Sequence, residues 1–177
     1  MNSLADQITA YAQMKHISAS TLSRWQAWAE DDQVAFLTLA QELQLGENQG
    51  RDFLDWLEEI ALRDGGTIHD LLARPEIRRA LDAKLGRNDK LKAVKDALRR
   101  LRYPRLSRLE EELRAAVKAL DLGSRVCVSF PPALEGDEVT VAIRARNVQE
   151  LAESLTRLQQ RIDDGTFQHV FDLLDQV

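Results

Sequence analysis

The residues in this sequence best suited to catalysis are four carboxylates on the outer side of a helix predicted at about 51–63. They are Asp52, Asp55, Glu58 and Glu59. Clustered carboxylates can act as general acids and bases or bind a divalent cation. No histidine, lysine or loop ligand lies nearby in the sequence to complete such a site. We therefore expect a solvated acidic face, for which Arg78 or Arg79 would be docking partners.

Histidine, cysteine and sequence motifs add little catalytic chemistry. His16, His69 and His169 are far apart and lack a second ligand at metal-binding spacing, so we expect no metal site. Cys127 has no CxxC partner and is predicted to be a small packed residue. No GxGxxG, P-loop or GxSxG motif occurs. The sequence predicts a protein without enzymatic activity, cofactor or metal.

Charge is distributed unevenly along the chain, although the net charge is only −5. Residues 74–108 contain thirteen Lys or Arg and four acidic residues, a net charge of +9. Residues 1–73 carry −8 and residues 109–177 carry −6. A concentrated basic surface is typical of phosphate binding. The basic stretch is therefore the first candidate binding surface.

The basic stretch also has a helical pattern. In a helix over 88–102, apolar residues recur at spacings of three and four and form one buried face: Leu91, Val94, Leu98 and Leu101. One position after each stands a basic residue, and these four make up the basic stripe: Lys92, Lys95, Arg99 and Arg102. At about 100° per residue the stripe lies directly beside the buried face. Such a stripe can follow a phosphate backbone, or it can be a solvated face whose ion pairs balance the acidic parts of the chain.

The composition is that of an ordinary globular protein. With 177 residues, 44% of them hydrophobic and 30% charged, the chain is long enough to bury a core. No apolar run approaches the ~20 residues needed to span a bilayer, and residues 1–10 do not have the pattern of a signal peptide. The single cysteine excludes an internal disulfide and suits a reducing compartment. We expect a cytoplasmic protein that does not bind membranes.

Residues 8–28 resemble a helix-turn-helix. In that family a small residue in the first helix is followed at intervals of five by two apolar residues, a spacing that Ala12, Ile17 and Leu22 reproduce. The run 20–25 is also similar to the recognition helices of bacterial repressors. His16 departs from the family, which usually has glycine in the turn.

The resemblance implies that the polar residues of the second helix face the major groove of DNA. These residues are Ser18, Ser20, Thr21 and Arg24. The alternative is an ordinary helical hairpin that places Trp25 and Trp28 in the core.

The hydrophobic period changes near residue 124. Before it, a helix over 107–120 is predicted to carry a heptad pattern: Leu106, Leu109, Leu113, Ala116 and Leu120. After it, apolar residues alternate with others around Val126–Phe130 and Val139–Ile143, which predicts an antiparallel hairpin. Helices are expected at about 148–162 and 166–175.

A two-stranded sheet leaves its edges open. We therefore expect a homodimer in which the heptad helix and the strands form the interface. The predicted interface residues are Leu109, Leu113, Val126, Val128, Val141 and Ile143. A local α/β cap on a helical domain is the alternative.

The order helix–strand–strand–helix over 106–162 is similar to the C-terminal dimerisation region of ParB-type chromosome-partition proteins. The resemblance lies in topology and pattern, not in a single motif. It implies that two copies pair their strands into one sheet and expose lysines to DNA. The GERRxR-type motif of that family does not occur in this chain, so no CTP-dependent clamp is implied.

These observations predict a mostly α (α+β) protein, with a helical domain at 1–104 and an α-β-β-α dimerisation-type unit at 105–177. The first predicted function is a DNA-associated protein, partition- or regulator-like, that binds phosphates through the basic stripe and Arg105. The alternative is a protein–protein adaptor, or an accessory subunit of a larger enzyme. Its basic helix would dock an acidic partner or the acidic N-terminal half of its own chain. The two functions differ in whether the basic surface is open or covered.

Overall fold

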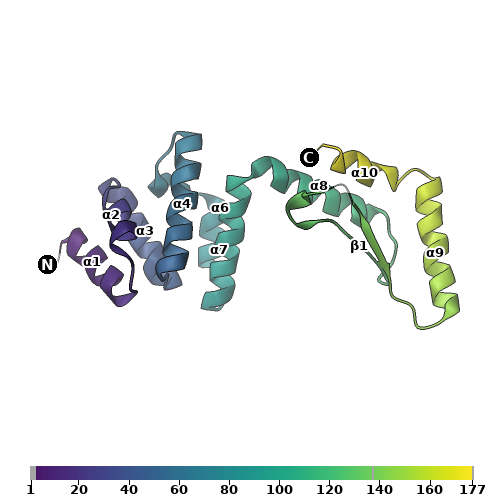
Figure 1. The fold of residues 1–177 in the computed structure, drawn as a ribbon, viewed down its shortest axis with the longest axis horizontal. Coiled ribbons are helices and arrows are strands. Elements are labelled where there is room, and N and C mark those ends of the chain that lie inside the picture. The colour runs from purple at the N-terminus through teal and green to yellow at the C-terminus, as the bar shows by residue number, and fades with distance from the viewer. Residues whose placement is uncertain (1–2, 137, 177) are drawn as a thin grey trace. The chain divides into compact units, whose positions relative to one another are not determined.

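The computed structural model describes residues 3–136 and 138–176, and these form a mostly α protein with one small β-hairpin (Figure 1). The predicted fold class is confirmed. The chain divides into two compact units between Arg102 and Tyr103. We call them the N-terminal unit and the C-terminal unit.

The N-terminal unit is helical throughout its described part. Its helices are α1 (Leu4–Met14), α2 (Ala19–Gln26), α3 (Glu30–Leu43), α4 (Glu47–Asp64), α5 (Ile68–Leu72), α6 (Pro75–Asp82) and α7 (Arg87–Arg102). Local signals set several of the ends. Ser18 caps α2 and Thr67 caps α5, each by accepting a backbone N–H with its hydroxyl. Pro75 is the first residue of α6, where its missing N–H costs nothing.

Helix α4 begins at Glu47, four residues before the predicted start at 51. The segment before 51 has the composition of a turn, and Gly46 adopts an extended conformation as the N-cap. The side chain of Glu47 accepts hydrogen bonds from the start of α2. This tertiary contact lies at the start of the added turn and is invisible to local sequence signals.

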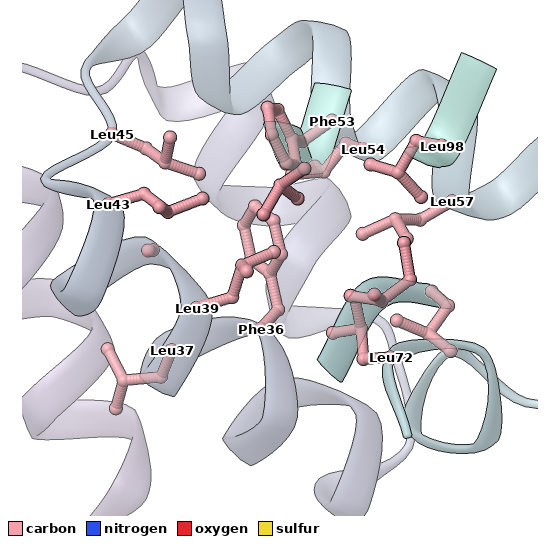
Figure 2. Packing of buried hydrophobic residues seen from close by; sticks show 14 of the residues in the cluster. Phe36, Leu37, Leu39, Leu43, Leu45, Phe53, Leu54, Leu57, Leu72 and Leu98 are labelled. Atoms are coloured by element: carbon pink, nitrogen blue, oxygen red, sulfur yellow. The ribbon is translucent and has the colours of Figure 1, made fainter. Parts of the chain in front are cut away.

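One hydrophobic core fills the N-terminal unit. Trp25, Phe36 and Phe53 are fully buried in it, and the rings of Trp25 and Phe36 meet edge to face at a centroid distance of 5.0 Å. Leucines from α3, α4, α5 and α7 surround the two phenylalanines (Figure 2). Leu98 brings α7 into this core, so the basic helix is an integral part of the unit.

Both ends of α7 are fixed by arginine side chains. Arg87, its first residue, donates from Nε to the carbonyl oxygen of Leu43 at 2.9 Å and from a terminal nitrogen to that of Gln44 at 3.1 Å. At the other end, Arg63 donates to the carbonyl oxygens of Leu101 and Arg102 at 2.8 and 2.7 Å. These bonds satisfy orphan carbonyls at the ends of α3 and α7. Helix α7 is therefore held tightly against α3 and α4.

The C-terminal unit combines helices with the hairpin. Its elements are α8 (Pro104–Ala119), β1 (Val126–Ser129), the short 3-10 helix η1 (Pro132–Leu134), β2 (Thr140–Ile143), α9 (Val148–Asp163) and α10 (Gln168–Leu174). The strands pair antiparallel, with Val126 opposite Ile143 and Val128 opposite Val141. The predicted hairpin is confirmed.

A second, separate core lies between α8, α10 and the hairpin. Leu113 of α8 and Leu120, the C-cap of that helix, share this core with Phe167, which lies just before α10, and with Val170 and Leu174 of α10. Helix α10 runs back along α8 (Figure 1). The heptad face of α8 is thus covered within the unit itself.

Candidate functional site

The basic stripe lies against the acidic helix α4. The Lys95 ammonium is 3.6 Å from the Asp52 carboxylate and 5.5 Å from the centre of the Trp56 ring, on which it makes a cation–π contact. Arg102 donates from Nε to Oε2 of Glu59 at 2.7 Å. Two members of the stripe are therefore engaged in contacts within the N-terminal unit.

The other members differ in exposure. Lys92 is exposed, and none of the described carboxylates pairs with it. Arg99 is half-buried. Lys90, just outside the stripe, pairs with Glu42 of α3 at 2.8 Å. Arg105 lies in the first turn of α8, exposed and without a carboxylate partner among the described residues.

All four carboxylates of the predicted acidic face pair with cations. In addition to the pairs of Asp52 and Glu59, a terminal nitrogen of Arg24 lies 2.8 Å from Asp55 and 2.6 Å from Glu58. The hydrogen bonds that Arg24 donates to Glu58 and then to Asp55 raise the pKa of its guanidinium. These ion pairs are a structural arrangement, with no free carboxylate poised for proton transfer.

The predicted docking of this face on Arg78 or Arg79 is wrong. Arg78 approaches Asp82 of its own helix at 3.7 Å, and Arg79 donates to the carbonyl of Pro75. Both residues lie on α6, whereas the cations that pair with these four carboxylates come from α2 and α7. Sequence proximity favoured the nearer arginines, but the packing of α7 against α4 decides the pairing.

Helices α1 and α2 are joined by a tight turn. His16 takes the left-handed position of the turn, with φ of 54°. The N–H of Ile17 donates to the carbonyl of Ala12 at 2.8 Å and that of His16 to Gln13 at 3.3 Å, the pattern of a Schellman motif. The turn therefore forms without the glycine that the family usually has there.

The polar residues of α2 are largely bound within the unit. Thr21 is 4% exposed, and its hydroxyl donates to Oε1 of Glu47 at 2.9 Å. Ser18 donates to the same carboxylate from its N–H and its hydroxyl. Arg24 is held by its ion pairs with α4. Ser20 is exposed, and its hydroxyl forms a hydrogen bond with that of Ser18, two residues earlier. Trp25 is buried and Trp28 half-buried, as a helical hairpin requires.

The carboxylate of Glu47 is a polar centre that local sequence signals did not reveal. Burial alone would raise its pKa. The hydrogen bonds from the backbone N–H of Ser18 and from the hydroxyls of Thr21 and Ser18 outweigh burial, and they lower the pKa below the ordinary value. Glu47 therefore stays ionised at the N-terminus of α2, where a negative charge is favourable.

Five of the six predicted dimer residues belong to the core of the C-terminal unit or pack against it. Leu109 and Leu113 are buried there, and Val126, Val128 and Val141 are half-buried on the same core. Ile143 is also half-buried. Cys127 was predicted to be packed, but it is exposed, because the alternation of β1 turns the valines inward and the cysteine outward.

Helix α9 carries a row of exposed large apolar residues. We call it the α9 stripe: Val148, Leu151, Leu155, Leu158 and Ile162. Four of its members are among the exposed large hydrophobic residues, with Val148 81% and Ile162 53% exposed. Leu158 packs against the core of the unit. The heptad spacing of the stripe is readable in the sequence, but nothing in the sequence shows that the stripe is uncovered.

Polar contacts hold α9 to its own unit on a different side. Arg125 pairs with Glu150 at 3.1 Å and with Glu153 at 3.5 Å. Arg161 donates from Nε to the carbonyl of Leu120 at 2.7 Å. The buried Ser154 lies between these contacts along the helix. The helix is thus anchored by polar groups while most of its apolar residues face solvent.

Among residues 3–136 and 138–176, no three His, Cys, Asp or Glu side chains come together as a metal-ligand set. None of the helices in the described ranges is both long and apolar enough to cross a membrane. Comparisons with protein-family models, with curated proteins and with solved structures each gave no match.

Proposed function

We propose that this chain is a non-enzymatic protein–protein interaction adaptor that presents the α9 stripe to a protein partner. The proposal rests on the exposure of four apolar side chains on one face of α9: Val148, Leu151, Leu155 and Ile162. Large apolar side chains that are contiguous and exposed are characteristic of interaction sites. When the apolar face of an amphipathic helix is not buried within its own unit, binding to a protein surface removes that face from water.

The placement of the basic helix supports the same proposal. Lys95 and Arg102 bind carboxylates of α4, and Lys90 binds one of α3. The basic helix therefore docks on the acidic N-terminal half of its own chain, the arrangement expected for the adaptor rather than for an open phosphate-binding surface. The N-terminal unit acts as a stable body, and the C-terminal unit carries the interaction surface.

A photo-crosslinking amino acid at position 155 tests this proposal. The full chain that carries this amino acid is irradiated in an extract of its native cells. The amino acid should then form covalent adducts with a protein partner. The same amino acid at Gln160 is the matched control, since Gln160 is exposed on the same helix away from the stripe. Adducts at 155 that disappear when Leu151 is changed to Glu support the proposal. Equal adducts at both positions, or none at 155, contradict it.

DNA association is the second candidate function, because some cations remain open. Lys92 on α7 and Arg105 and Arg108 on α8 are exposed, and none pairs with a described carboxylate. The measurement is fluorescence anisotropy of a labelled random duplex at about 50 and about 200 mM salt. Binding that weakens by about a thousandfold between these salt concentrations, and that is reduced by Lys92→Glu or Arg105→Glu, would support DNA association. Absence of binding at the lower salt concentration would eliminate it.

A further inference from the structure

We infer that the partner of the α9 stripe is the same stripe on a second copy of this chain, with the two α9 helices antiparallel. This inference rests on the proposed function, because it names the occupant of the surface proposed there. The first observation is the spacing. The stripe residues follow one another at intervals of three and four, the heptad repeat by which two helices pack along a shared seam.

The charges around the stripe favour an identical helix as the partner. The charged residues Glu150, Glu153 and Arg161 lie away from the stripe and are engaged inside the C-terminal unit. On the solvent side the stripe is bordered by the uncharged Gln149, Ala152, Thr156 and Gln159 and, in the last turn of the helix, by Asp163. At such a border a strongly charged partner finds one charged group, Asp163, at one end of the stripe. A second copy brings the same largely uncharged border, and in an antiparallel pair the two Asp163 side chains lie at opposite ends of the seam and do not repel each other.

A two-fold axis makes this pairing self-complementary. In such an interface the same patch serves both copies, so one uncovered stripe is sufficient for a closed dimer. The antiparallel orientation follows from the helix dipoles, since each negative C-terminal end then lies beside a positive N-terminal end. It places Val148 of one copy near Ile162 of the other. Ala152, small and exposed, allows the helices to approach closely.

The size of the surface sets the strength of the pairing. A helix of 16 residues is about 24 Å long. A seam of that length buries less than the roughly 800 Å² per partner of a standard stable interface. We therefore expect a reversible dimer with a dissociation constant on the order of micromolar rather than nanomolar.

Sedimentation equilibrium of the full chain tests the dimer. From about 1 to about 200 µM the average mass should rise from 20.1 kDa toward twice that value. Leu155→Glu should weaken the dimer by at least about a hundredfold, because it places a carboxylate in the apolar seam. Gln160→Glu is the matched control and should dimerise like the wild type. Leu155 is about half exposed in the single chain, so its variant is expected to fold, which circular dichroism checks.

Cysteine crosslinking tests the orientation. In a chain with Cys127→Ser, a mixture of Val148→Cys and Ile162→Cys chains should oxidise to a mixed disulfide-linked pair, whereas Val148→Cys alone should not link to itself. Self-linking at 148 overturns the antiparallel arrangement.

A monomer throughout the concentration range, or a dimer unaffected by Leu155→Glu, overturns the inferred partner. If the chain is monomeric but position 155 still crosslinks to a different protein, the adaptor function stands and only the second copy is excluded. If neither self-association nor specific crosslinking occurs, the proposed function fails as well.

Discussion

The hydroxyl of Thr21 donates a 2.9 Å hydrogen bond to the carboxylate of Glu47, which joins α2 to α4. Ser18 donates to the same carboxylate from its N–H and its hydroxyl. Two residues that the helix-turn-helix resemblance directs toward DNA thus bind a negative charge of their own unit. The N-terminus of α2 is occupied by that carboxylate, which takes the position an external anion would need.

Replacing Glu47 by Gln should lower the free energy of unfolding of the N-terminal unit by about 1–2 kcal/mol at pH 7. The pKa of Glu47 is lowered in the folded protein, so its stabilisation is present above the ordinary value of 4.5. The stabilisation is lost as the pH falls through the lowered pKa. Urea unfolding followed by tryptophan fluorescence should therefore show a difference between wild type and Glu47→Gln that shrinks below pH 4.5.

The control for this prediction is Glu30→Gln. Glu30 is an exposed acid in the first turn of α3, with no side-chain partner among the described residues. The Glu30→Gln variant measures the effect of removing a charge at a helix N-terminus that accepts no hydrogen bonds like those of Glu47. A Glu47→Gln effect that is independent of pH, or no larger than that of Glu30→Gln, would contradict the assigned role of the carboxylate.

Local signals in the sequence predicted the turn between α1 and α2 but not the surroundings of α2. The spacing of Ala12, Ile17 and Leu22 and the cap at Ser18 are properties of neighbouring residues, and they correspond to real features of the fold. The contacts of Thr21 and Arg24 depend on α4, more than twenty residues away. Periodicity identifies a face of a helix, but the element that covers this face is set by tertiary packing.

Charge reversal within the basic stripe should separate internal from open cations. Lys95→Glu places a carboxylate beside Asp52 and removes the cation from the Trp56 ring. We expect it to destabilise the N-terminal unit by about 1 kcal/mol. Lys92→Glu should change the stability by less than about 0.5 kcal/mol, because Lys92 is exposed. Thermal unfolding of the two variants gives the comparison, and equal effects would show that the stripe behaves as one solvated surface.

Tyr11 should resist ionisation until strongly alkaline pH. Its hydroxyl lies 2.6 Å from the carbonyl oxygen of Ala40 and 2.9 Å from that of Leu45, and it donates to them in the core. Burial raises its pKa from 10.0 to about 12. The stabilisation from the neutral phenol is thus complete below pH 10 and is lost as the pH rises toward 12.

The measurement for Tyr11 is an ultraviolet titration of tyrosinate in a Tyr103→Phe chain. The sequence contains two tyrosines, so this variant leaves Tyr11 as the single phenol. Ionisation should appear near pH 12 or together with unfolding. Reversible ionisation near pH 10 in the folded protein would show that the hydroxyl is open to water.

His16→Gly should stabilise the N-terminal unit by about 0.5–1 kcal/mol. His16 has a φ of 54°, which is unfavourable for a residue with a Cβ atom and natural for glycine. Gln13→Gly is the matched control, because Gln13 is exposed inside α1, where glycine costs about 1 kcal/mol. Opposite signs for the two substitutions in chemical unfolding are expected, and destabilisation by both would contradict the strain at position 16.

The C-terminal unit shows why the predicted dimer surface and the exposed surface differ. The residues 106–120 and the α9 stripe have the same heptad spacing, so periodicity alone cannot rank them. In the structure Phe167, Val170 and Leu174 cover α8. Most of the α9 stripe has no such cover among the described residues. The sequence predicted α8, α9 and the hairpin. Which of the two helices exposes its apolar face depends on where α10 packs.

The two hydrophobic cores share no residue, and this has a consequence for how the chain melts. All members of the first core lie in the N-terminal unit and all members of the second lie in the C-terminal unit. Cooperativity in unfolding arises from a shared core, so calorimetry should resolve two transitions rather than one. Leu98→Ala, which empties part of the first core, should lower the midpoint of one transition and leave the other in place. On this expectation the chain melts as two thermodynamic units within one polypeptide.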